Sequence, residues 1–218
     1  MSHHAQLSIE FQNFWHAGSG RSSGHHLDAV CLKDKNQLPY FPGRQLKGIL
    51  RQAVRRAEAW GWYQSMPLES GLAQNYEELL FGSNSQDSER NHTFAGVLQV
   101  DNANLSELEY TYLQSPDQAQ LREFLFDELF STAIDDNGTA KKHSLRGIEV
   151  CMPTQLVAPL TLQLTALDHS HQQQQQKWLG TSDPWQILRT ALPLIDALGA
   201  HRSRGLGEAI LSLQVKGS

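Results

Sequence analysis

The sequence predicts an α/β protein of the mixed α+β type, built on a ferredoxin-like core. Three observations lead to this prediction: an alternating strand pattern opens the chain, an amphipathic helix follows, and a second helix leads into a final strand. Shorter strand patterns lie between the helices, giving the order of the ferredoxin-like and RNA-recognition-motif folds. We expect one domain over residues 1–218, with a glycine-rich C-terminal loop. Insertions are expected around residues 64–94, 104–146 and 168–182.

The first strand is expected within residues 5–15, where apolar and polar side chains alternate. A loop with three glycines follows over residues 18–24 and contains Arg21. Glycine lets a backbone approach a ligand closely, so this loop is either a binding loop that uses the charge of Arg21 or a flexible linker. No Gly-Lys-Ser/Thr follows, which excludes a nucleotide-binding P-loop.

The first helix is expected over residues 45–62, after a turn formed by Pro42 and Gly43. Its apolar side chains recur every three or four residues, as on one buried helix face. These residues are Leu46, Ile49, Leu50, Ala53, Val54, Ala57 and Trp60. A second face is basic, with Arg44 nearby and with Lys47, Arg51 and Arg55. We expect Trp60 and Trp62 to belong to the core rather than to a base-stacking platform.

The remaining elements follow from shorter patterns. Strands are expected over residues 96–101, 147–151, 160–167 and 208–215. A helix within residues 106–131 is expected to bury Leu121, Phe124, Leu125 and Leu129. The last helix begins at Asp183 and Pro184, an N-cap followed by a first-turn proline, and is expected to kink at Pro193. The glutamine-rich segment from residue 169 is expected to be a solvated loop.

Charge is distributed unevenly along the chain, although its net value is only −5. Residues 21–56 hold eight basic and two acidic side chains (+6), and residues 57–138 hold two basic and fifteen acidic ones (−13). Residues 139–218 hold eight basic and five acidic side chains, for a net charge of +3. Electrostatic screening acts over about 8 Å at physiological salt, so local patches decide whether phosphate binds. The segregation favours a basic cleft over a uniformly mixed surface.

Cysteine content and hydropathy bear on where the protein acts. Cys31 and Cys151 are isolated in a chain with no secretory signal pattern, so both are expected to be reduced and packed. No apolar run approaches the roughly 20 residues that a membrane span needs. We expect a cytoplasmic protein without a membrane partner.

Two further segments combine turns with basic residues. Residues 135–138 favour a turn, and the basic arm behind it carries Lys141, Lys142 and Arg146. Residues 199–207 form a glycine-rich loop with Arg202 and Arg204. Exposed backbone N–H groups and arginine side chains are suited to phosphate, so both segments are candidate binding loops.

Two motifs carry a resemblance to a known family. The run Pro39-Tyr40-Phe41-Pro42-Gly43, followed by Leu46-Lys47-Gly48-Ile49-Leu50-Arg51, resembles the signature of the RAMP superfamily of CRISPR-associated proteins. The run Gly199-Ala200-His201-Arg202-Ser203-Arg204-Gly205-Leu206-Gly207 resembles the glycine-rich loop of the same superfamily. The resemblance implies a backbone subunit of a type III-like effector complex in antiviral defence. Its implied partners are guide RNA, complementary target RNA, other effector subunits and copies of itself in a helical backbone.

The resemblance also implies functions for single residues. Asp28 lies fourteen residues before Pro42, approximately where backbone subunits carry an aspartate needed to cut target RNA, with Asp34 as the fallback candidate. Asp28 would then be both catalytic residue and ligand of a divalent metal, Mg²⁺ or Mn²⁺. The arm at 141–146 is similar to the segment that crosses the guide–target duplex in that family. We expect RNA to contact Arg21, Arg44, Lys47, Arg51, Arg55, Lys141, Lys142, Arg146, Arg202 and Arg204.

Three other functions remain open from the sequence. The chain could be a non-catalytic RNA-binding subunit, capping the complex or holding the 5′ handle of the guide, with Asp28 only structural. It could be a metal-independent guide-processing ribonuclease with His16, His25 or His26 as general base. His16, His25 and Asp28 could also converge on a metal, although their spacing does not require it. A small-molecule enzyme would need a catalytic constellation that the sequence does not contain.

Overall fold

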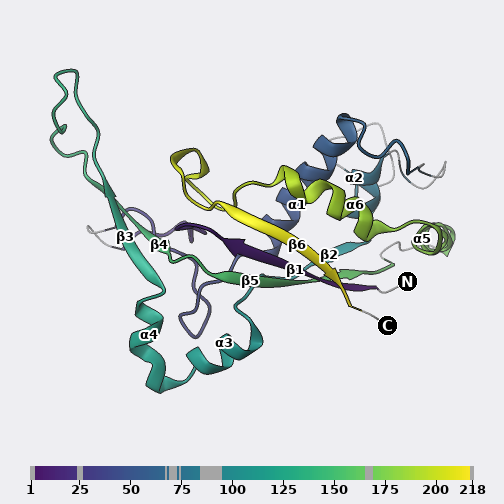
Figure 1. The fold of residues 1–218 in the computed structure, drawn as a ribbon, viewed down its shortest axis with the longest axis horizontal. Helices are drawn as coiled ribbons and strands as arrows, with labels where there is room; N and C mark the ends of the chain where they lie inside the picture. Colours follow the sequence, from purple (N-terminus) through teal and green to yellow (C-terminus); the bar gives the residue numbers. More distant parts are fainter. Residues whose placement is uncertain are drawn as a thin grey trace.

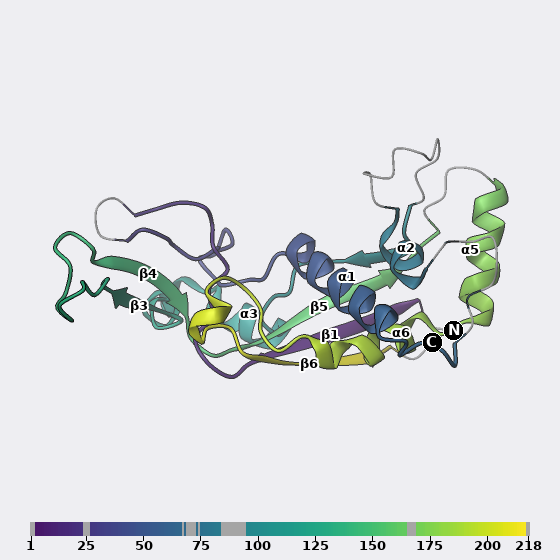
Figure 2. The ribbon, with the colours of Figure 1, turned by 90° about the horizontal axis from the view of Figure 1, so that it is seen from above.

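The core of the protein is a four-stranded antiparallel sheet with the strand order β2-β5-β1-β6 (Figure 1). The computed structural model describes residues 3–23, 27–66, 68, 73, 75–83, 95–164 and 169–216. The strands are β1 (His4–Phe11), β2 (Leu98–Val100), β5 (Gln155–Leu162) and β6 (Ala209–Val215). Helices α1 (Gly43–Ala59) and α6 (Pro184–Ala191) cover one face of this sheet (Figures 1 and 2). The predicted ferredoxin-like core is confirmed.

The central strand β1 pairs with β5 on one side and with β6 on the other. Its buried residues are Ala5, Leu7, Ile9 and Phe11, and its alternate side chains Gln6 and Ser8 are only partly buried. Leu7 lies between Ala158 of β5 and Leu213 of β6. A side-chain period of two therefore fixes the sheet register, as the sequence predicts.

Helix α1 begins at Gly43, two residues before the predicted start. A side chain at this position would not fit, because a Cβ atom would lie 2.4 Å from the carbonyl oxygen of Val100. The Gly43 N–H instead donates to Asn102 Oδ1 at 2.8 Å. This close approach ties the start of α1 to the end of β2. The apolar face predicted for the helix is buried at Leu46, Leu50, Ala53, Val54 and Ala57.

A second, two-stranded sheet projects from one end of the core (Figure 1). It consists of β3 (Phe126–Ser131) and β4 (Arg146–Cys151), and the chain between them is the expected basic hairpin. Short helical elements precede it: α3 (Glu107–Leu113), η1 (Pro116–Gln118) and α4 (Ala119–Glu123). The prediction of one helix with Leu121, Phe124, Leu125 and Leu129 on its apolar face is wrong. Helical structure ends at Glu123, Leu129 lies in β3, and Leu121 and Phe124 are 43% and 74% exposed. Proline at 116 cannot donate its backbone N–H, which favours a break after α3.

The glutamine-rich segment differs from the prediction as well. Residues His169–Thr181 form helix α5 and not a loop. Glutamine is a good helix former, and the segment gains packing because Trp178 is fully buried and Leu179 nearly so. The Gln175 amide donates to the carbonyl of Ala95 at 3.0 Å, which ties the helix to the chain before β2.

The end of α1 also differs from the sequence-based prediction. Trp60 and Trp62 were expected in the core, yet their exposed fractions are 57% and 41%. Helix α1 ends at Ala59 with Trp60 as its C-cap residue, so neither tryptophan continues the buried apolar face of the helix. The expected core assignment of this pair is therefore wrong.

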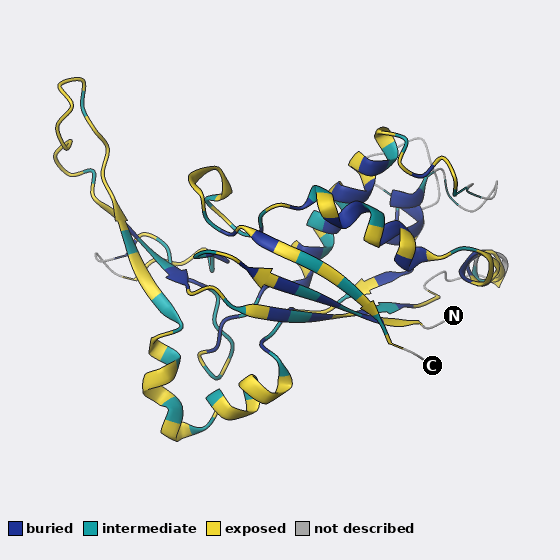
Figure 3. Ribbon diagram, in the orientation of Figure 1, coloured by how far each residue is buried: buried dark blue, intermediate teal, exposed yellow. Residues whose placement is uncertain are grey.

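Buried residues concentrate in β1, β5, α1, α2 and α6, whereas the β3–β4 hairpin and the segment from α3 to α4 are mostly exposed (Figure 3). The remaining short elements are α2 (Tyr76–Phe81), η2 (Leu192–Leu194) and η3 (Arg202–Arg204). η2 contains Pro193, where a kink was predicted. Among the described helices, none combines the length and apolar character that crossing a membrane requires.

Helix α2 is joined to the basic face of α1 by a single carboxylate. Arg51 Nε donates to Glu77 Oε1 at 2.6 Å, and Arg55 donates to both carboxylate oxygens at 2.6 Å. Arg51 also donates to the carbonyl of Gly82 at 2.8 Å. The Glu77 side chain is only 10% exposed. Part of the basic face of α1 therefore neutralises a nearly buried acid within the same chain.

We expect Glu77→Gln to lower the free energy of unfolding by about 2 kcal/mol at neutral pH, because hydrogen bonds to charged groups contribute about 1.5–3 kcal/mol. The Arg55 guanidinium, aided by Arg51, holds the pKa of Glu77 below its ordinary value of 4.5. This stabilisation is present above the unfolded-state pKa and is lost as the pH falls through the lowered folded-state pKa. Urea unfolding curves should therefore show the difference between wild type and variant shrinking below pH 4.5.

The exposed Glu123→Gln, on α4, is the matched control and should leave stability unchanged at every pH. A Glu77→Gln effect that does not vary with pH would contradict the ion-pair explanation.

Candidate functional site

Asp28 lies near the outer end of the β3–β4 ladder, where the loop after β1 runs beside β4. Its backbone N–H donates to the carbonyl of Gly147 at 2.8 Å, and the Gly147 N–H donates to Asp28 Oδ2 at 3.0 Å. The next residue, Ala29, bridges to Ile148 in parallel orientation. The Asp28 side chain is exposed, and its second oxygen, Oδ1, takes no part in this pairing. One carboxylate oxygen of this exposed side chain is therefore anchored, and the other is left out of the pairing.

Glu149 fastens the chain that follows Asp28 to β4. Its Oε2 accepts the backbone N–H of Cys31 at 2.9 Å, and its Oε1 forms an ion pair with Lys33 Nζ at 2.7 Å. The Glu149 side chain is 13% exposed. Lys33 also lies over the ring of Phe126, 3.9 Å from the ring centroid. These contacts hold residues 28–33 against the base of the hairpin.

A buried cluster beneath Glu149 joins the same loop to the glycine-rich loop. His16 is 2% exposed, and its Nδ1 lies 2.6 Å from the carbonyl oxygen of Glu149 and 3.4 Å from Cys31 Sγ. The Ala200 N–H donates to the carbonyl of His16 at 2.8 Å. At Gly199, where φ is +96°, a Cβ atom would lie 2.5 Å from that carbonyl oxygen. Glycine at 199 is thus needed for the glycine-rich loop to dock on the loop that carries Asp28.

The ionisable groups of this cluster influence one another. A hydrogen bond with Cys151 lowers the pKa of the Cys31 thiol to about 6, with a further contribution from His16. The hydrogen bond with Cys31 raises the pKa of His16 above 6.5. Burial raises the pKa of Cys151. Both cysteines are free and buried, as expected. Since His16 is buried and bonded to backbone, it is not placed to act as a general base, and His25 and His26 lie outside the described residues.

The predicted basic residues fall into two groups. Most are exposed, and these are Arg21, Arg44, Arg55, Lys141, Lys142, Arg146, Arg202 and Arg204. Three are engaged inside the chain: Arg51 with Glu77 and Gly82, the exposed Arg55 also with Glu77, and Lys47, whose Nζ donates to the carbonyl of Leu98 at 2.7 Å. Burial, followed by the charge of Arg51, lowers the pKa of Lys47. The hairpin, the Asp28 segment and the glycine-rich loop lie toward one end of the sheet (Figures 1 and 2).

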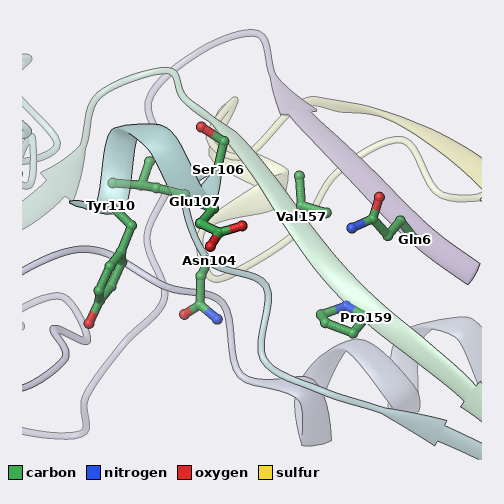
Figure 4. Close-up of a pocket in the computed structure, with 8 residues that line it drawn as sticks. Gln6, Asn104, Ser106, Glu107, Tyr110, Val157 and Pro159 are labelled. Atoms are coloured by element: carbon green, nitrogen blue, oxygen red, sulfur yellow. The ribbon is translucent and has the colours of Figure 1, made fainter. Parts of the chain in front are cut away.

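The open face of the sheet offers little for nucleic-acid stacking. Cross-strand pairing places the following residues on it: His4, Gln6, Ser8, Glu10, Gln99, Gln155, Val157, Pro159, Thr161, Ile210, Ser212 and Gln214. None of these is a phenylalanine, tyrosine, tryptophan, lysine or arginine. A hollow between this face and α3 is lined by polar side chains such as Asn104 and Glu107, by apolar ones such as Val157 and Pro159, and by Tyr110, whose hydroxyl is bonded to Asp34 (Figure 4). Of the side chains that stack on bases in RNA-recognition motifs, the paired positions of this face supply only His4, at the start of β1.

Both carboxylate oxygens of Asp34 accept hydrogen bonds from the protein itself. Its Oδ1 accepts the N–H groups of Asn36 and Leu38 at 2.8 and 2.9 Å, as expected for a turn residue. Its Oδ2 accepts the Tyr110 hydroxyl at 2.7 Å, which joins the turn to α3. Both oxygens are thus used within the chain, so Asp28 is the better placed of the two aspartates for binding a ligand.

Among the described residues, no group of three His, Cys, Asp or Glu side chains is arranged to hold a metal ion. Asp28 alone would supply one carboxylate oxygen. This fits a hard cation such as Mg²⁺, which retains several waters and is bound by one or two carboxylates together with phosphate oxygens. It does not fit a metal held entirely by protein ligands.

Comparison with known proteins identifies the family. The RAMP superfamily model matches residues 8–210. The chain belongs to the RAMP superfamily. A search of curated protein sequences gave no significant match.

Solved structures share this RAMP fold at low sequence identity. A chain of the type III-B Cmr-beta complex in its apo state aligns with a TM-score of 0.59 and 11% identity, covering 96% of both chains. A chain of Cmr-beta bound to cognate target RNA aligns with a TM-score of 0.63 and 10% identity, again covering 96% of both. A chain of a type IV-B CRISPR complex aligns with a TM-score of 0.53 and 16% identity, and the alignment covers 99% of this chain and 93% of that one. At such identities the likeness shows a common fold.

Sequence reasoning did not find the function of Glu149 as a clamp. Residues 31 and 149 are separated by 118 positions, and no local pattern indicates that a backbone N–H and a carboxylate so far apart will meet. The buried contact of His16 with the carbonyl of Glu149, 133 positions away, was missed for the same reason. The one related sequence-based expectation was that the two cysteines would be buried.

We expect Glu149→Gln to loosen residues 28–33, because it removes the ion pair with Lys33 and one of the two acceptor oxygens. Losing about 1.5–3 kcal/mol of charged hydrogen bonding should speed amide hydrogen exchange at Cys31 roughly 10- to 100-fold. Exchange in the central strand β1 should not change. The measurement is hydrogen–deuterium exchange with peptide resolution, with Glu123→Gln as control. Unchanged exchange at Cys31 would show that Glu149 is not the clamp.

Proposed function

We propose that this RAMP protein is an RNA-binding subunit of a CRISPR effector ribonucleoprotein in antiviral defence. In this proposal it holds guide RNA, meets complementary target RNA, and assembles with other effector subunits and with copies of itself in a helical backbone. Its superfamily membership and its fold, shared with subunits of Cmr-beta and of a type IV-B complex, support the proposal. The observation that carries it is the gathering of exposed basic segments toward one end of the sheet.

The proposed phosphate contacts come from three segments on that end. Lys141, Lys142 and Arg146 lie along the hairpin, Arg202 and Arg204 in η3, and Arg21 in the loop after β1. Arg44 adds a charge in the first turn of α1, where unpaired backbone N–H groups also favour anions. Lys47, Arg51 and Arg55 remain predicted RNA contacts, although all three already bond within the chain. Such contacts position RNA without reading its sequence.

We further propose that the subunit cuts target RNA beside Asp28 with Mg²⁺ or Mn²⁺. The backbone pairing with Gly147 fixes Asp28, and the clamp of Glu149 holds the following residues, so Oδ1 would keep one position relative to RNA lying on the hairpin. A bound divalent cation would help deprotonate the attacking 2′-hydroxyl and stabilise charge on the phosphate. The chain itself would contribute one ligand and the in-line positioning of RNA.

One observation favours a second candidate function. Asp28 has no acidic, histidine or cysteine companions arranged for a metal within the described part of the chain. A non-catalytic subunit that caps the complex or holds the 5′ handle would need no such companions. A metal-independent guide-processing activity is less favoured, since His16 is buried.

Asp28→Asn separates the charge of Asp28 from its structural hydrogen bond, because an asparagine oxygen can still accept the Gly147 N–H. In the purified assembly we expect Mg²⁺-dependent cleavage of guide-complementary RNA to fall at least about 100-fold, the scale of losing a metal ligand. Guide affinity should stay within about twofold, since phosphate contacts come from the basic segments. EDTA should abolish cleavage by the wild type.

Asp136→Asn, an exposed acid on the hairpin turn, is the matched control and should cleave normally. Undiminished cleavage by Asp28→Asn would remove Asp28 from the reaction. A wild-type assembly that binds guide and target but cleaves with neither Mg²⁺ nor Mn²⁺ would instead support the non-catalytic subunit.

Replacing Arg202 and Arg204 together with alanine should weaken guide binding by a similar factor for all RNA sequences. The slope of log affinity against log salt should become shallower by about 1.5, since each lost phosphate contact contributes about 0.7 to 0.9. Filter binding at several salt concentrations measures both quantities. Arg189→Ala with Lys216→Ala removes two exposed charges elsewhere and is the control. Equal slopes for both double variants would contradict the proposed contribution of the glycine-rich loop.

A further inference from the structure

The end of helix α1 exposes two tryptophans side by side. The rings of Trp60 and Trp62 have centroids 5.7 Å apart at an interplanar angle of 55°. Their exposed fractions of 57% and 41% contrast with the other three tryptophans, Trp15, Trp178 and Trp185, which are at most 1% exposed. Two adjacent indoles in water forgo a large amount of favourable burial, so an exposed pair indicates a surface that meets a partner.

The local backbone fixes this pair in place. Helix α1 ends at Ala59, and Gly61 then takes a positive φ of 75°. The N–H groups of Gly61 and Trp62 donate to the carbonyls of Glu58 and Ala57, both at 2.9 Å. The turn therefore closes on the helix end and places the second indole beside the first. The platform is preorganised, which lowers the entropic cost of binding.

A guanidinium completes the platform. Arg56 lies over the Trp60 ring, 5.1 Å from the ring centroid, and donates to the carbonyl of Leu194 at 3.3 Å. The exposed side chains of α1 between residues 43 and 57 are basic, amide or glycine: Arg44, Gln45, Gly48, Gln52, Arg55 and Arg56. No aspartate or glutamate occurs over that stretch. The first acid, Glu58, is occupied, since its Oε1 accepts the Tyr76 N–H at 2.9 Å.

We propose that Trp60 and Trp62 bind an unpaired base of single-stranded RNA by stacking, with the phosphates of that strand on the outer arginines of α1. Sequence-tolerant single-strand binders combine these two features: a positive path for the backbone and aromatic side chains for the bases. A protein interface would need an apolar centre around the tryptophans. The exposed part of α1 carries no large aliphatic side chain, which favours RNA over a protein partner. The platform requires that the chain binds RNA, as proposed above, but not that it cuts RNA.

The test uses the purified full chain and an unstructured oligoadenylate of about ten nucleotides, within the site sizes of such binders. Since three of the five tryptophans are buried, RNA added to the protein should quench the emission of Trp60 and Trp62 selectively. Trp60→Leu and Trp62→Leu should each weaken binding about 5- to 100-fold, the range for one stacked base. Trp60→Tyr should retain most of the affinity, because tyrosine still stacks.

Three outcomes would overturn the platform. If Trp60→Leu binds as tightly as Trp60→Tyr, stacking is not involved. If an abasic oligomer of equal length binds as tightly as oligoadenylate, only phosphates are recognised. If the tryptophan variants lose self-association in sedimentation while keeping RNA affinity, the surface contacts a protein.

The same assay separates this proposal from the proposed function. Guide binding that depends on Arg202 and Arg204 but not on the tryptophans would reject the platform alone. A chain and assembly that bind no RNA at all would reject both.

Discussion

The carboxylate of Glu149 joins the two parts of the chain on which the candidate site depends. One part is the loop after β1, which carries Asp28, and the other is β4 at the base of the hairpin. Because Glu149 accepts a backbone N–H with one oxygen and the Lys33 ammonium with the other, it restrains both position and charge. Ordering an exposed loop rich in glycine and serine costs conformational entropy, and these contacts offset that cost. The loop that carries Asp28 is thus held by a partly buried acid on another element.

Helix α1 shows how one basic face can serve two purposes. The side of the helix toward α2 and β2 uses Lys47 and Arg51 to satisfy Leu98, Gly82 and Glu77. The side toward solvent keeps Arg44 and Arg56 outward and ends at the exposed tryptophans. Periodicity in the sequence places all these cations on a helix but does not show which acids will fold against them. The partner Glu77 is 26 residues from Arg51, on an element that packs there only in the folded protein.

The sequence was sufficient for the framework of the fold and less so for its details. Strand alternation in β1 and the apolar face of α1 predict burial directly, since both depend on local periodicity, and the hairpin follows from its turn and basic residues. The helix at 169–181 was missed because low complexity suggested solvation, whereas Trp178 supplies a buried anchor. The exposure of Trp60 was missed because a helical pattern continues in the sequence beyond the residue where the helix ends. For the site, position relative to Pro42 pointed to Asp28, but the supporting contacts of Glu149 and His16 join residues more than a hundred positions apart.

The account requires RNA to lie on the basic end of the molecule and not on the open face of the sheet. Ultraviolet cross-linking of guide RNA to the purified assembly, followed by mass spectrometry of the cross-linked peptides, tests this most directly. We expect cross-links in the hairpin around Lys141 and Lys142 and in the loop around Arg202 and Arg204. Cross-links confined to the open-face residues of β1 and β5, with none in the hairpin or the glycine-rich loop, would contradict the account.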